Sequence, residues 1–265
     1  MSSDGKGWAL ILGASSGFGG ATARELARNG FDIFGVHLDL RATLPNAQAI
    51  VQEIESAGRR AVFFNMNAAD AAKRAEAVEA IAREAAKDGS FVRVLLHSLA
   101  FGALQPVIAE DAKAALSQRQ LEMTLDVMAN SLIYWAQDLV ARNLLRRGSR
   151  IFAMTSSGST RVIRSYGAVS AAKAALEAHI RQLAFELAPL GITANAIRAG
   201  VTDTPALRRI PEGLALLERV RQSNPSGRAT TPEDVAKAIA VLSDERLQWL
   251  TGNVIGVDGG EEITV

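Results

Sequence analysis

Short apolar runs alternate along the chain with longer stretches in which apolar residues recur at the spacing of a helix. The runs predict β-strands near 8–12, 31–38, 60–65, 91–97, 150–154, 192–197 and 253–257. The stretches between them predict α-helices near 17–29, 45–57, 70–87, 119–146, 166–188 and 232–242. This alternation is typical of an α/β fold with a doubly wound parallel sheet of about seven strands and helices on both faces.

The same pattern indicates how the chain is divided. Neither a sequence repeat nor a low-complexity linker interrupts it, so we expect a single domain over residues 1–265. The least regular segment is residues 201–228, which contains Pro205, Pro211 and Pro225. This segment follows a predicted strand, where ligand-covering loops occur in open α/β sheets, and we interpret it as a substrate lid.

The composition narrows the classes of function. The 265 residues are 48% hydrophobic and carry a formal net charge of +1, with basic residues spread along the chain. This distribution argues against nucleic-acid binding, and no apolar run approaches the roughly twenty residues that span a bilayer. The polar segment Met1 to Lys6 lacks the apolar core of a secretory signal, so we expect a cytoplasmic protein. We expect no metal site, because cysteine is absent and the histidines show no paired spacing.

Candidate chemistry begins where the first predicted strand ends. The apolar run Trp8 to Leu12 breaks into the glycine-rich stretch 13–20, and a helix-compatible stretch, Ala21 to Arg28, follows. Glycines let the backbone turn tightly and approach a pyrophosphate, whose charge is met by free N–H groups at the start of the helix. This strand, turn and helix therefore predict a Rossmann-like dinucleotide site.

The next predicted strand indicates which dinucleotide binds. The run Phe31 to Leu38 ends at Asp39, about twenty residues beyond the glycine turn, where a carboxylate accepts hydrogen bonds from a ribose diol. Asp39 therefore favours NAD. Arg41 stands two residues further on and supports NADP as the alternative, because an arginine there can hold the 2′-phosphate.

Several separate motifs resemble the short-chain dehydrogenase/reductase family over essentially the whole chain. The stretch 12–19 is similar to the family's Thr-Gly-x-x-x-Gly-x-Gly turn, with leucine in place of threonine. Asn195, Gly200 and Thr204 match an Asn-x-x-x-x-Gly-x-x-x-Thr run, and residues 257–260 match the carboxyl-terminal Val-Asp-Gly-Gly signature. The resemblance implies cofactor contacts from Gly13, Ser15, Ser16, Phe18, Gly19, Asp39, Asn67, His97, Ser98, Lys173, Gly200, Thr202 and Thr204.

Two of these residues have a simpler interpretation as well. Asn67 ends the third predicted strand, where asparagine is also a common turn former. His97 ends the fourth predicted strand beside the expected nicotinamide, but a histidine there also serves as a hydrogen-bond partner of the backbone. Both interpretations stay open for these two positions.

The family's usual catalytic set is a serine, a Tyr-x-x-x-Lys pair and an asparagine from an earlier helix. The resemblance identifies Ser156 and Lys173 as the serine and the lysine, but Val169 stands four residues before the lysine. Tyr166 lies three residues earlier still, and Met128 occupies the asparagine position. The set found in carbonyl reductases is therefore incomplete in this chain.

The displaced tyrosine can keep its role if it lies on the same helix. Three residues are nearly one turn, so Tyr166 would share a face with Val169 and lie about 4.5 Å along the axis. We expect Lys173 to hold the nicotinamide ribose, and its charge to lower the pKa of the tyrosine from about 10. Tyr134, the other tyrosine, lies in an apolar helical stretch and is interpreted as packing.

Both departures resemble the enoyl-thioester reductase branch of the family, which carries Tyr-x6-Lys. Six residues separate Tyr166 from Lys173. The stretch 96–102 is similar to the branch's His-Ser-Ile-Gly-Phe segment, and residues 199–200 read Ala-Gly in place of Pro-Gly. Ser156 stands where many members have a further tyrosine, as in a bacterial subgroup that uses NADPH.

The resemblance implies reduction of the carbon–carbon double bond of an enoyl thioester in fatty-acid synthesis, with a substrate on acyl carrier protein or coenzyme A. A phenol directed at the thioester oxygen would stabilise and protonate the enolate that forms. Two alternatives stay open: a carbonyl or alcohol reductase with a displaced tyrosine, and a dinucleotide-binding regulator without catalysis. Helices 119–146 and 166–188 resemble those that pair subunits in the family, so we expect a homotetramer.

Overall fold

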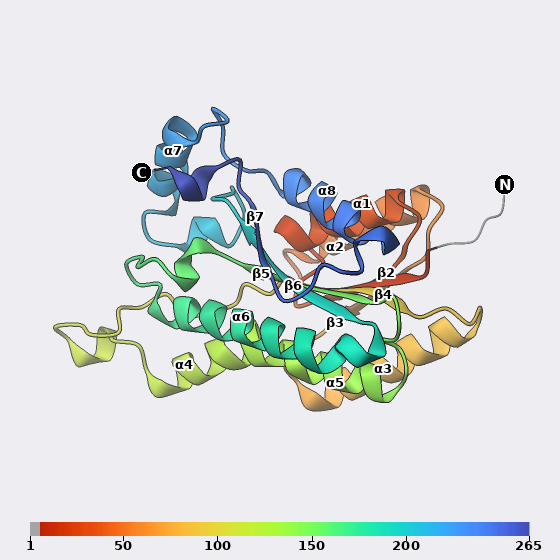
Figure 1. Ribbon diagram of the computed structural model, residues 1–265. Helices are drawn as coiled ribbons and strands as arrows, with labels where there is room; N and C mark the ends of the chain where they lie inside the picture. Colours follow the sequence, from red (N-terminus) through yellow and green to blue (C-terminus); the bar gives the residue numbers. More distant parts are fainter. Residues whose placement is uncertain (1–5, 265) are drawn as a thin grey trace.

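Parallel strands form one sheet of seven strands in the order β3-β2-β1-β4-β5-β6-β7 (Figure 1). The computed structural model describes residues 6–264. Most of the segment Met1 to Lys6, in which we expect no secretory signal, therefore lies outside the described residues. The strands are β1 Trp8–Leu12, β2 Asp32–His37, β3 Ala61–Asn65, β4 Val92–His97, β5 Arg150–Thr155, β6 Thr193–Ala199 and β7 Val254–Val257. Each coincides with a predicted strand to within a residue or two, and the predicted fold class is confirmed.

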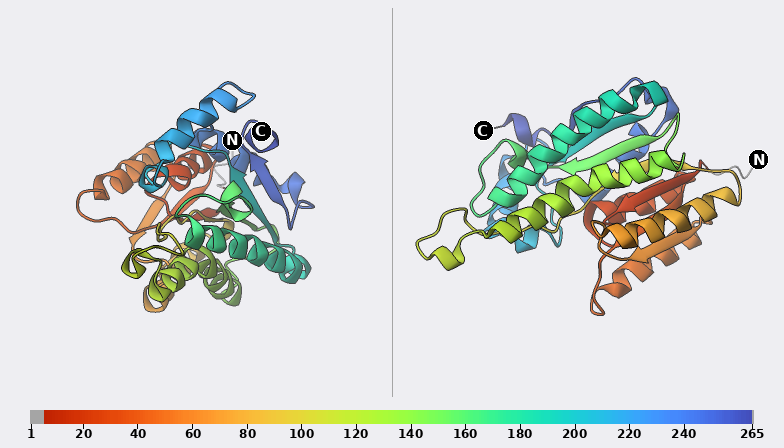
Figure 2. Two further views of the ribbon diagram at one scale, coloured as in Figure 1. Left: turned by 90° about the vertical axis from the view of Figure 1, so that its left-hand side faces the viewer. Right: turned by 90° about the horizontal axis from the view of Figure 1, so that it is seen from below.

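Helices cover both faces of this sheet (Figures 1 and 2). One face carries α1 Gly17–Arg28, α2 Leu44–Ser56 and α8 Pro232–Leu242. The other carries α3 Ala71–Ala86, α4 Gln118–Leu125, α5 Ser131–Ala141 and α6 Gly167–Leu187. A further helix, α7 Gly213–Ser223, lies in the segment between β6 and α8.

Strand β1 explains why the chain forms a sheet with two buried faces. Successive residues of a strand point to opposite faces, so Leu10 and Leu12 join one core cluster while Ala9 and Ile11 join the other. Both clusters are buried, which requires the continuous apolar run seen in the sequence. Each fully buried leucine or isoleucine contributes about 1.5–3 kcal/mol to the free energy of unfolding.

The strand order fixes where a ligand can bind. Strand β1 pairs with β2 on one side and with β4 on the other, so the succession of strands changes direction between β1 and β4. Open α/β sheets bind ligands at such a point, outside the carboxyl ends of the strands. The loops that follow β1, β4, β5 and β6 therefore define the region of interest.

The structure differs in detail from the prediction in two helical regions. The predicted helix 119–146 is interrupted by a π-helix over Asp126–Asn130, and α5 ends before the left-handed residue Asn143 (φ 54°). A π-helix adds one residue to a helical turn. The segments before and after it both show an apolar helical pattern, so the sequence does not reveal the extra residue. The predicted irregular lid also contains helix α7, which begins after the left-handed residue Glu212 (φ 63°).

None of the helices within residues 6–264 combines the length and the apolarity needed to cross a membrane.

Candidate active site

The predicted site residues gather at the carboxyl ends of the strands around the switch point. Residues 13–19 follow β1, Ser98 follows β4, Ser156 follows β5, and residues 200–204 follow β6. Because these strands are parallel and adjacent, the loops after them meet at one edge of the sheet (Figure 2, left). The site is therefore assembled from four segments that are distant in sequence.

The glycine turn after β1 is packed so closely that it excludes side chains. Gly13 has a φ of +94°, and a Cβ atom there would overlap the carbonyl oxygen of Ser98. A Cβ atom on Gly19 would overlap the carbonyl oxygen of Gly13. The turn also approaches the loop after β6, because the Cγ2 atom of Thr204 would lie 3.6 Å from a Cβ atom on Gly17. Such close approach of backbone is what a pyrophosphate site requires.

Helix α1 begins directly after this turn without a side chain that caps it. Ser16 is the N-cap residue and is extended (φ −163°), but its hydroxyl makes no capping hydrogen bond. The first turn contains no acidic residue, and the half-buried Phe18 packs against the core cluster beneath the helix. The amide groups at this end are left for another acceptor, and their partial positive charge favours an anion. These residues fit the pyrophosphate of a dinucleotide.

Asp39 is held beside the glycine turn by several neighbours. Its Oδ2 atom lies 2.8 Å from Nδ1 of His37, and its backbone N–H and carbonyl exchange hydrogen bonds with the side chain of Asn65. Partial burial raises the pKa of Asp39, but hydrogen bonds from Thr43, Ser15 and His37 outweigh it and keep the pKa below its ordinary value. Asp39 is therefore an ionised carboxylate fixed at the position predicted for the ribose diol.

Sequence reasoning missed the residues that fix Asp39, and for Asn67 the structure shows a turn contact while its predicted contact with the cofactor stays a prediction. His37 stands two residues before Asp39, on the same side of an extended chain, which is the signal that could have linked them. Asn67 is exposed, and its Oδ1 accepts a hydrogen bond from the N–H of Ala69 at 3.0 Å. This contact is the turn-forming role described above as the simpler interpretation.

Tyr166 and Ser156 lie together, but the tyrosine does not lie on helix α6 as the sequence predicts. Tyr166 is the N-cap residue of α6 and follows Ser165, whose φ of 58° is left-handed. Its ring and the Ser156 hydroxyl both adjoin Gly158, where a Cβ atom would lie 2.7 Å from Cε1 of Tyr166 and 3.1 Å from Oγ of Ser156. The strained residue before the helix therefore directs the phenol, a pattern found at functional sites.

The pKa of Tyr166 differs from the predicted direction. Burial raises the pKa, and a hydrogen bond with Ser156 opposes this effect without reversing it. Lys173 does not reverse this direction; its ammonium donates to the carbonyl oxygen of Met154 at 2.6 Å. The phenol is therefore protonated at neutral pH.

Lys173 is buried in the interface between α6 and the sheet. The residue is 6% exposed, and burial lowers the pKa of its ammonium to about 8, against an opposing effect of Glu177. The remaining donors of the ammonium are available for a ribose hydroxyl. Lys173 therefore fits the predicted cofactor contact. Because its pKa is lowered, it loses its charge at a lower pH than a surface lysine does.

The two positions at which the usual polar residues are missing form an apolar contact. Val169 is 4% exposed and Met128, in the π-helix, is 2% exposed. The backbone of Gly102 lies directly against both, since a Cβ atom there would be 2.6 Å from Cγ2 of Val169 and 2.8 Å from Sδ of Met128. The loop after β4 therefore fills the space in which a tyrosine four residues before the lysine would stand.

His97 lies in the interior instead of facing a ligand. Its exposed fraction is 0%, and its Nε2 atom lies 2.9 Å from Oγ of Ser131, which itself donates to the carbonyl of Val127. Burial, with a smaller contribution from the charge of Lys173, lowers the pKa of the imidazole to about 3, so it is neutral. A side chain without accessible surface cannot touch a cofactor in this structure. The neighbouring Ser98 donates its N–H to the carbonyl of Leu12 at 2.8 Å.

The lid segment is anchored by its own hydroxyl groups and by the carboxyl-terminal region. Thr202 donates to the carbonyl of Gly200 at 2.9 Å, and Thr204 accepts from the N–H of Leu207 at 3.2 Å. The Oε2 atom of Glu261 accepts the N–H of Val201 at 2.9 Å, across 60 residues of sequence. The residues predicted to contact the cofactor here thus also shape the start of the lid.

Exposed apolar side chains surround this end of the sheet. Large hydrophobic residues with more than half of their surface exposed occur in the segments that follow β4 to β7, one of them in α7: Phe101, Val107, Ile108, Val162, Leu214 and Ile263. Val107 also lies beside the start of α6, since its Cγ2 would be 2.8 Å from a Cβ atom on Gly167. An apolar ligand could be covered by these loops.

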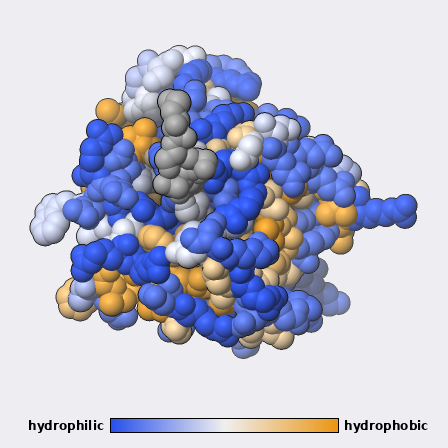
Figure 3. Space-filling model, turned by 90° about the vertical axis from the view of Figure 1, so that its right-hand side faces the viewer, coloured by the Kyte–Doolittle hydropathy of each residue, from blue (hydrophilic) through white to orange (hydrophobic). Residues whose placement is uncertain are grey.

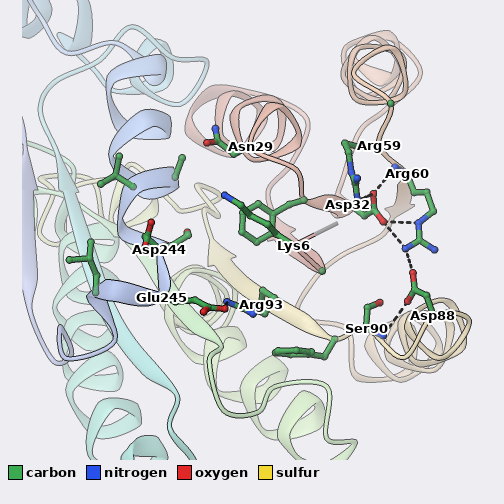
Figure 4. A pocket seen from close by; sticks show the side chains of 18 of the residues that line it. Lys6, Asn29, Asp32, Arg59, Arg60, Asp88, Ser90, Arg93, Asp244 and Glu245 are labelled. Atoms are coloured by element: carbon green, nitrogen blue, oxygen red, sulfur yellow. Dashed lines mark hydrogen bonds and ion pairs between the residues drawn. The ribbon is translucent and has the colours of Figure 1, made fainter. Parts of the chain in front are cut away.

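A broad depression lies at the opposite edge, where the strands begin (Figure 4). Hydrophilic residues cover much of that face (Figure 3). Its charged side chains pair with one another: Asp32 with Arg59 at 2.7 Å and with Arg60 at 2.6 Å, and Arg93 with Glu245 at 2.6 Å. None of the predicted site residues lies in this region. Within residues 6–264 no group of three metal-binding side chains is found at either edge.

Comparison with known proteins gives one family model and many relatives of different activity. The model described as "Enoyl-(Acyl carrier protein) reductase" matches residues 13–262. The chain is 30% identical to 1-cyclohexenylcarbonyl-CoA reductase of Streptomyces collinus, over 96% of this chain and 86% of that protein. It is 30% identical to 3-oxoacyl-[acyl-carrier-protein] reductase of Aggregatibacter actinomycetemcomitans, over 95% and 97%. A short chain dehydrogenase from Burkholderia cenocepacia, solved in complex with NADP, has a TM-score of 0.81 and 29% identity, over 97% and 98%.

Proposed function

The chain belongs to the short-chain dehydrogenase/reductase family, and we propose that it reduces the carbon–carbon double bond of an enoyl thioester. Membership makes it an oxidoreductase that uses a nicotinamide dinucleotide, NAD or NADP. The enoyl thioester, carried on acyl carrier protein or on coenzyme A, is the finer part of the proposal. A role in fatty-acid synthesis belongs to the same proposal.

The observation that carries the proposal is the replacement of polar by apolar residues next to Lys173. Val169 and Met128 stand where carbonyl-reducing relatives have tyrosine and asparagine, and both are buried against Gly102. The phenol stands instead at Tyr166, at the N-terminus of α6 and beside Ser156. A donor displaced in this way suits an oxygen that lies farther from the hydride acceptor, as the oxygen of a conjugated thioester does.

The residues of the site divide the chemistry between them. The dinucleotide, when bound, supplies hydride to the carbon β to the thioester, and negative charge then grows on the thioester oxygen. Tyr166, kept protonated because burial raises its pKa, donates to that oxygen. Lys173 would hold the ribose, and Ser156 lies beside the phenol and opposes the effect of burial on its pKa.

Asp39 supports NAD as the preferred cofactor. Its carboxylate is ionised at neutral pH and is held beside the glycine turn, where it can accept both hydroxyl groups of a ribose. The same negative charge would repel a 2′-phosphate. Arg41 is exposed two residues further on and would favour NADP if it reached the site.

The exposed apolar loops support an acyl substrate. Phe101, Val107 and Val162 lie on loops that follow β4 and β5, on the side of the site where Tyr166 stands. Covering such side chains with an acyl chain removes apolar surface from water, worth about 25 cal/mol for each Å². The carrier would lie outside these loops.

A homotetramer is also part of the proposal. Helix α6 presents Phe185 with 79% of its surface exposed, and Trp249, before β7, is 96% exposed. Large exposed aromatic residues are enriched at interfaces between subunits. Sedimentation that gives a monomer at all protein concentrations would remove this part of the proposal.

A carbonyl reductase is the second candidate. The 30% identity to a 3-oxoacyl-[acyl-carrier-protein] reductase over nearly the whole chain favours it, as does the presence of Ser156 and Lys173. Val169 and Met128 count against it, because neither can donate a proton to a ketone oxygen.

Oxidation of NADH, and separately of NADPH, with crotonyl and longer enoyl thioesters tests the proposal, with a ketoacyl thioester as the comparison substrate. We expect turnover of the enoyl thioesters and a loss of about 10²–10³-fold in kcat for Tyr166→Phe, the size found when a donor to a developing oxyanion is removed. Tyr134→Phe is the matched control. Tyr134 donates to Asp126 at 3.0 Å in the helical layer and should leave kcat unchanged.

Other results would point elsewhere. Turnover with the ketoacyl thioester alone would establish the second candidate. Tight binding of a dinucleotide without turnover of any substrate would favour the non-catalytic regulator. Equal losses in Tyr166→Phe and Tyr134→Phe would remove the special role of Tyr166.

A further inference from the structure

A carboxylate with no role in the proposed reaction lies one helical turn beyond Lys173. Glu177 and Lys173 are four residues apart on α6, so their side chains project from the same face of the helix. Glu177 is half-buried, and its Oε1 atom accepts a hydrogen bond from Oγ1 of Thr155 at 2.6 Å. Most of the residues on this face of α6 are apolar core residues.

Both side chains are held by the end of the same strand. Lys173 donates to the carbonyl of Met154, and Glu177 accepts from Thr155, which is the last residue of β5 and only 5% exposed. Two consecutive residues of β5 thus fix an ammonium and a carboxylate at the end of the sheet that carries the site. The hydrogen bond satisfies the buried hydroxyl of Thr155 and holds the carboxylate of Glu177 on the face of α6 that carries Lys173.

The charge of Lys173 depends on few neighbours. Burial lowers the pKa of His97, on β4, and keeps this imidazole neutral, and the charge of Lys173 lies close enough to contribute to the lowering. His179, further along α6, bonds to Asn130 and also has a lowered pKa because of burial. Burial lowers the pKa of Lys173, and Glu177 supplies the negative charge that opposes this effect.

We propose that Glu177, held in place by Thr155, is a positioning residue that keeps Lys173 charged at neutral pH and so sustains dinucleotide binding. This inference rests on the proposed function only in assuming that Lys173 contacts the cofactor. The pair would act through Lys173 without touching substrate or cofactor.

The proposal gives a definite dependence on pH. With Glu177 present, burial leaves the pKa of Lys173 at about 8, so the ammonium is the main form at pH 7. Without the carboxylate that pKa falls further, and the neutral amine becomes the main form at a lower pH. Binding of NADH should therefore be lost at lower pH in a variant without the carboxylate, and it should recover on acidification. One pH unit in the midpoint corresponds to about a tenfold change in affinity at a fixed pH above both midpoints.

The experiment is a titration of the intact protein with NADH, or with NADPH if that binds more tightly, at pH values from 6 to 9. We expect the midpoint of the loss of affinity to move down by about one unit in Glu177→Gln, so that affinity at pH 9 falls about tenfold and affinity at pH 6 is unchanged. Glu177→Asp should restore much of the shift. Glu186→Gln, an exposed carboxylate further along α6 that accepts from Gln182, is the matched control and should have no effect.

A second substitution covers the case in which Glu177→Gln does not fold. Thr155→Val keeps the carboxylate but removes its hydrogen bond, and a smaller shift in the same direction is expected, which Thr155→Ser should not produce. A folded Glu177→Gln or Thr155→Val with the midpoint of the unmodified protein would overturn the proposal. So would a loss of affinity that is the same at every pH, because a purely structural role predicts that result. If the unmodified protein binds neither dinucleotide at any pH, the proposed function itself fails.

Discussion

The two ends of the sheet differ in whether their polar groups have hydrogen-bond or ion-pair partners within the protein. At the amino ends of the strands, Asp32 is 3% exposed and is held by Arg59 and Arg60, while Arg93 pairs with Glu245. At the carboxyl ends, by contrast, the first turn of α1 has no capping side chain. At the amino ends these charged side chains pair with one another. At the carboxyl ends the backbone N–H groups at the start of α1 are left to bind a ligand.

The difference teaches how one sheet can supply both stability and function. A buried charge that is paired and hydrogen-bonded contributes to a unique fold, and removing its partner is destabilising. A donor that is left without a partner lowers stability slightly but is available when a ligand arrives. We therefore expect substitutions at the carboxyl ends to change binding or turnover and those at the amino ends to change the free energy of unfolding.

The largest effect in this comparison is expected for Gly19→Ala. The added methyl group would overlap the carbonyl oxygen of Gly13, so the turn must shift. A displacement of about 1 Å at a binding site costs about a hundredfold, and we expect a loss of that size in kcat/KM for the dinucleotide. Gly256→Ala is the control, since a Cβ atom there would meet only ordinary contacts of 3.6 Å or more. Unchanged kcat/KM in Gly19→Ala would mean that this turn does not bind the cofactor.

A smaller effect, on the free energy of unfolding instead of kcat/KM, is expected for Asp32→Asn. The substitution leaves two arginines without their shared carboxylate, and we expect the free energy of unfolding to fall by about 2 kcal/mol. This value is below that for a fully buried pair because the side chain of Arg60 is 43% exposed. Chemical denaturation measures the loss, and kcat/KM of the folded fraction should stay the same. Asp88→Asn, which removes only an exposed partner of Arg60, should cost less than about 1 kcal/mol.

Equal stabilities of Asp32→Asn and the unmodified protein would contradict the assignment of the amino ends to stability. Loss of turnover without loss of stability would show that the two ends are coupled, and the comparison would then need to be abandoned.

The smallest effect is expected for Asp39→Ser. Because hydrogen bonds hold the pKa of Asp39 below its ordinary value, the carboxylate is charged throughout the neutral range. Its removal should raise the ratio of kcat/KM for NADPH to that for NADH about tenfold, which corresponds to about 1.4 kcal/mol. Arg41→Ala should lower the same ratio only if that arginine reaches the 2′-phosphate. A ratio that Asp39→Ser leaves unchanged would place the choice of cofactor elsewhere.

The strands and the location of the site are predictable from the sequence because both depend on local pattern. A parallel strand buried on both faces must be continuously apolar, as Trp8 to Leu12 are, and a close backbone approach must contain glycine. Such requirements are visible in any short stretch of the chain. They also fix which ends of the strands carry the chemistry.

The orientation of individual side chains could not be predicted, because it depends on contacts that are distant in sequence. His97, on strand β4, lies in the interior, where Ser131 at the start of helix α5 is its hydrogen-bond partner. Tyr166 lies outside helix α6 because the left-handed Ser165 ends the preceding turn there. The raised pKa of Tyr166 likewise reflects burial by several segments at once. The spacing of six residues before Lys173 therefore points to a tyrosine that lies beside Ser156, although this residue precedes the helix instead of lying on it.

The contact between Glu261 and Val201 has a consequence for the order in which the protein matures during synthesis. The ribosome releases Val201 60 residues before its partner, an interval of about 3–12 s at ordinary rates of elongation. Throughout that interval β6 has β5 beside it but lacks β7, so the lid begins from a strand with one unpaired edge. We expect the dinucleotide site to be the last part of the molecule to become competent, after the rest of the sheet has formed.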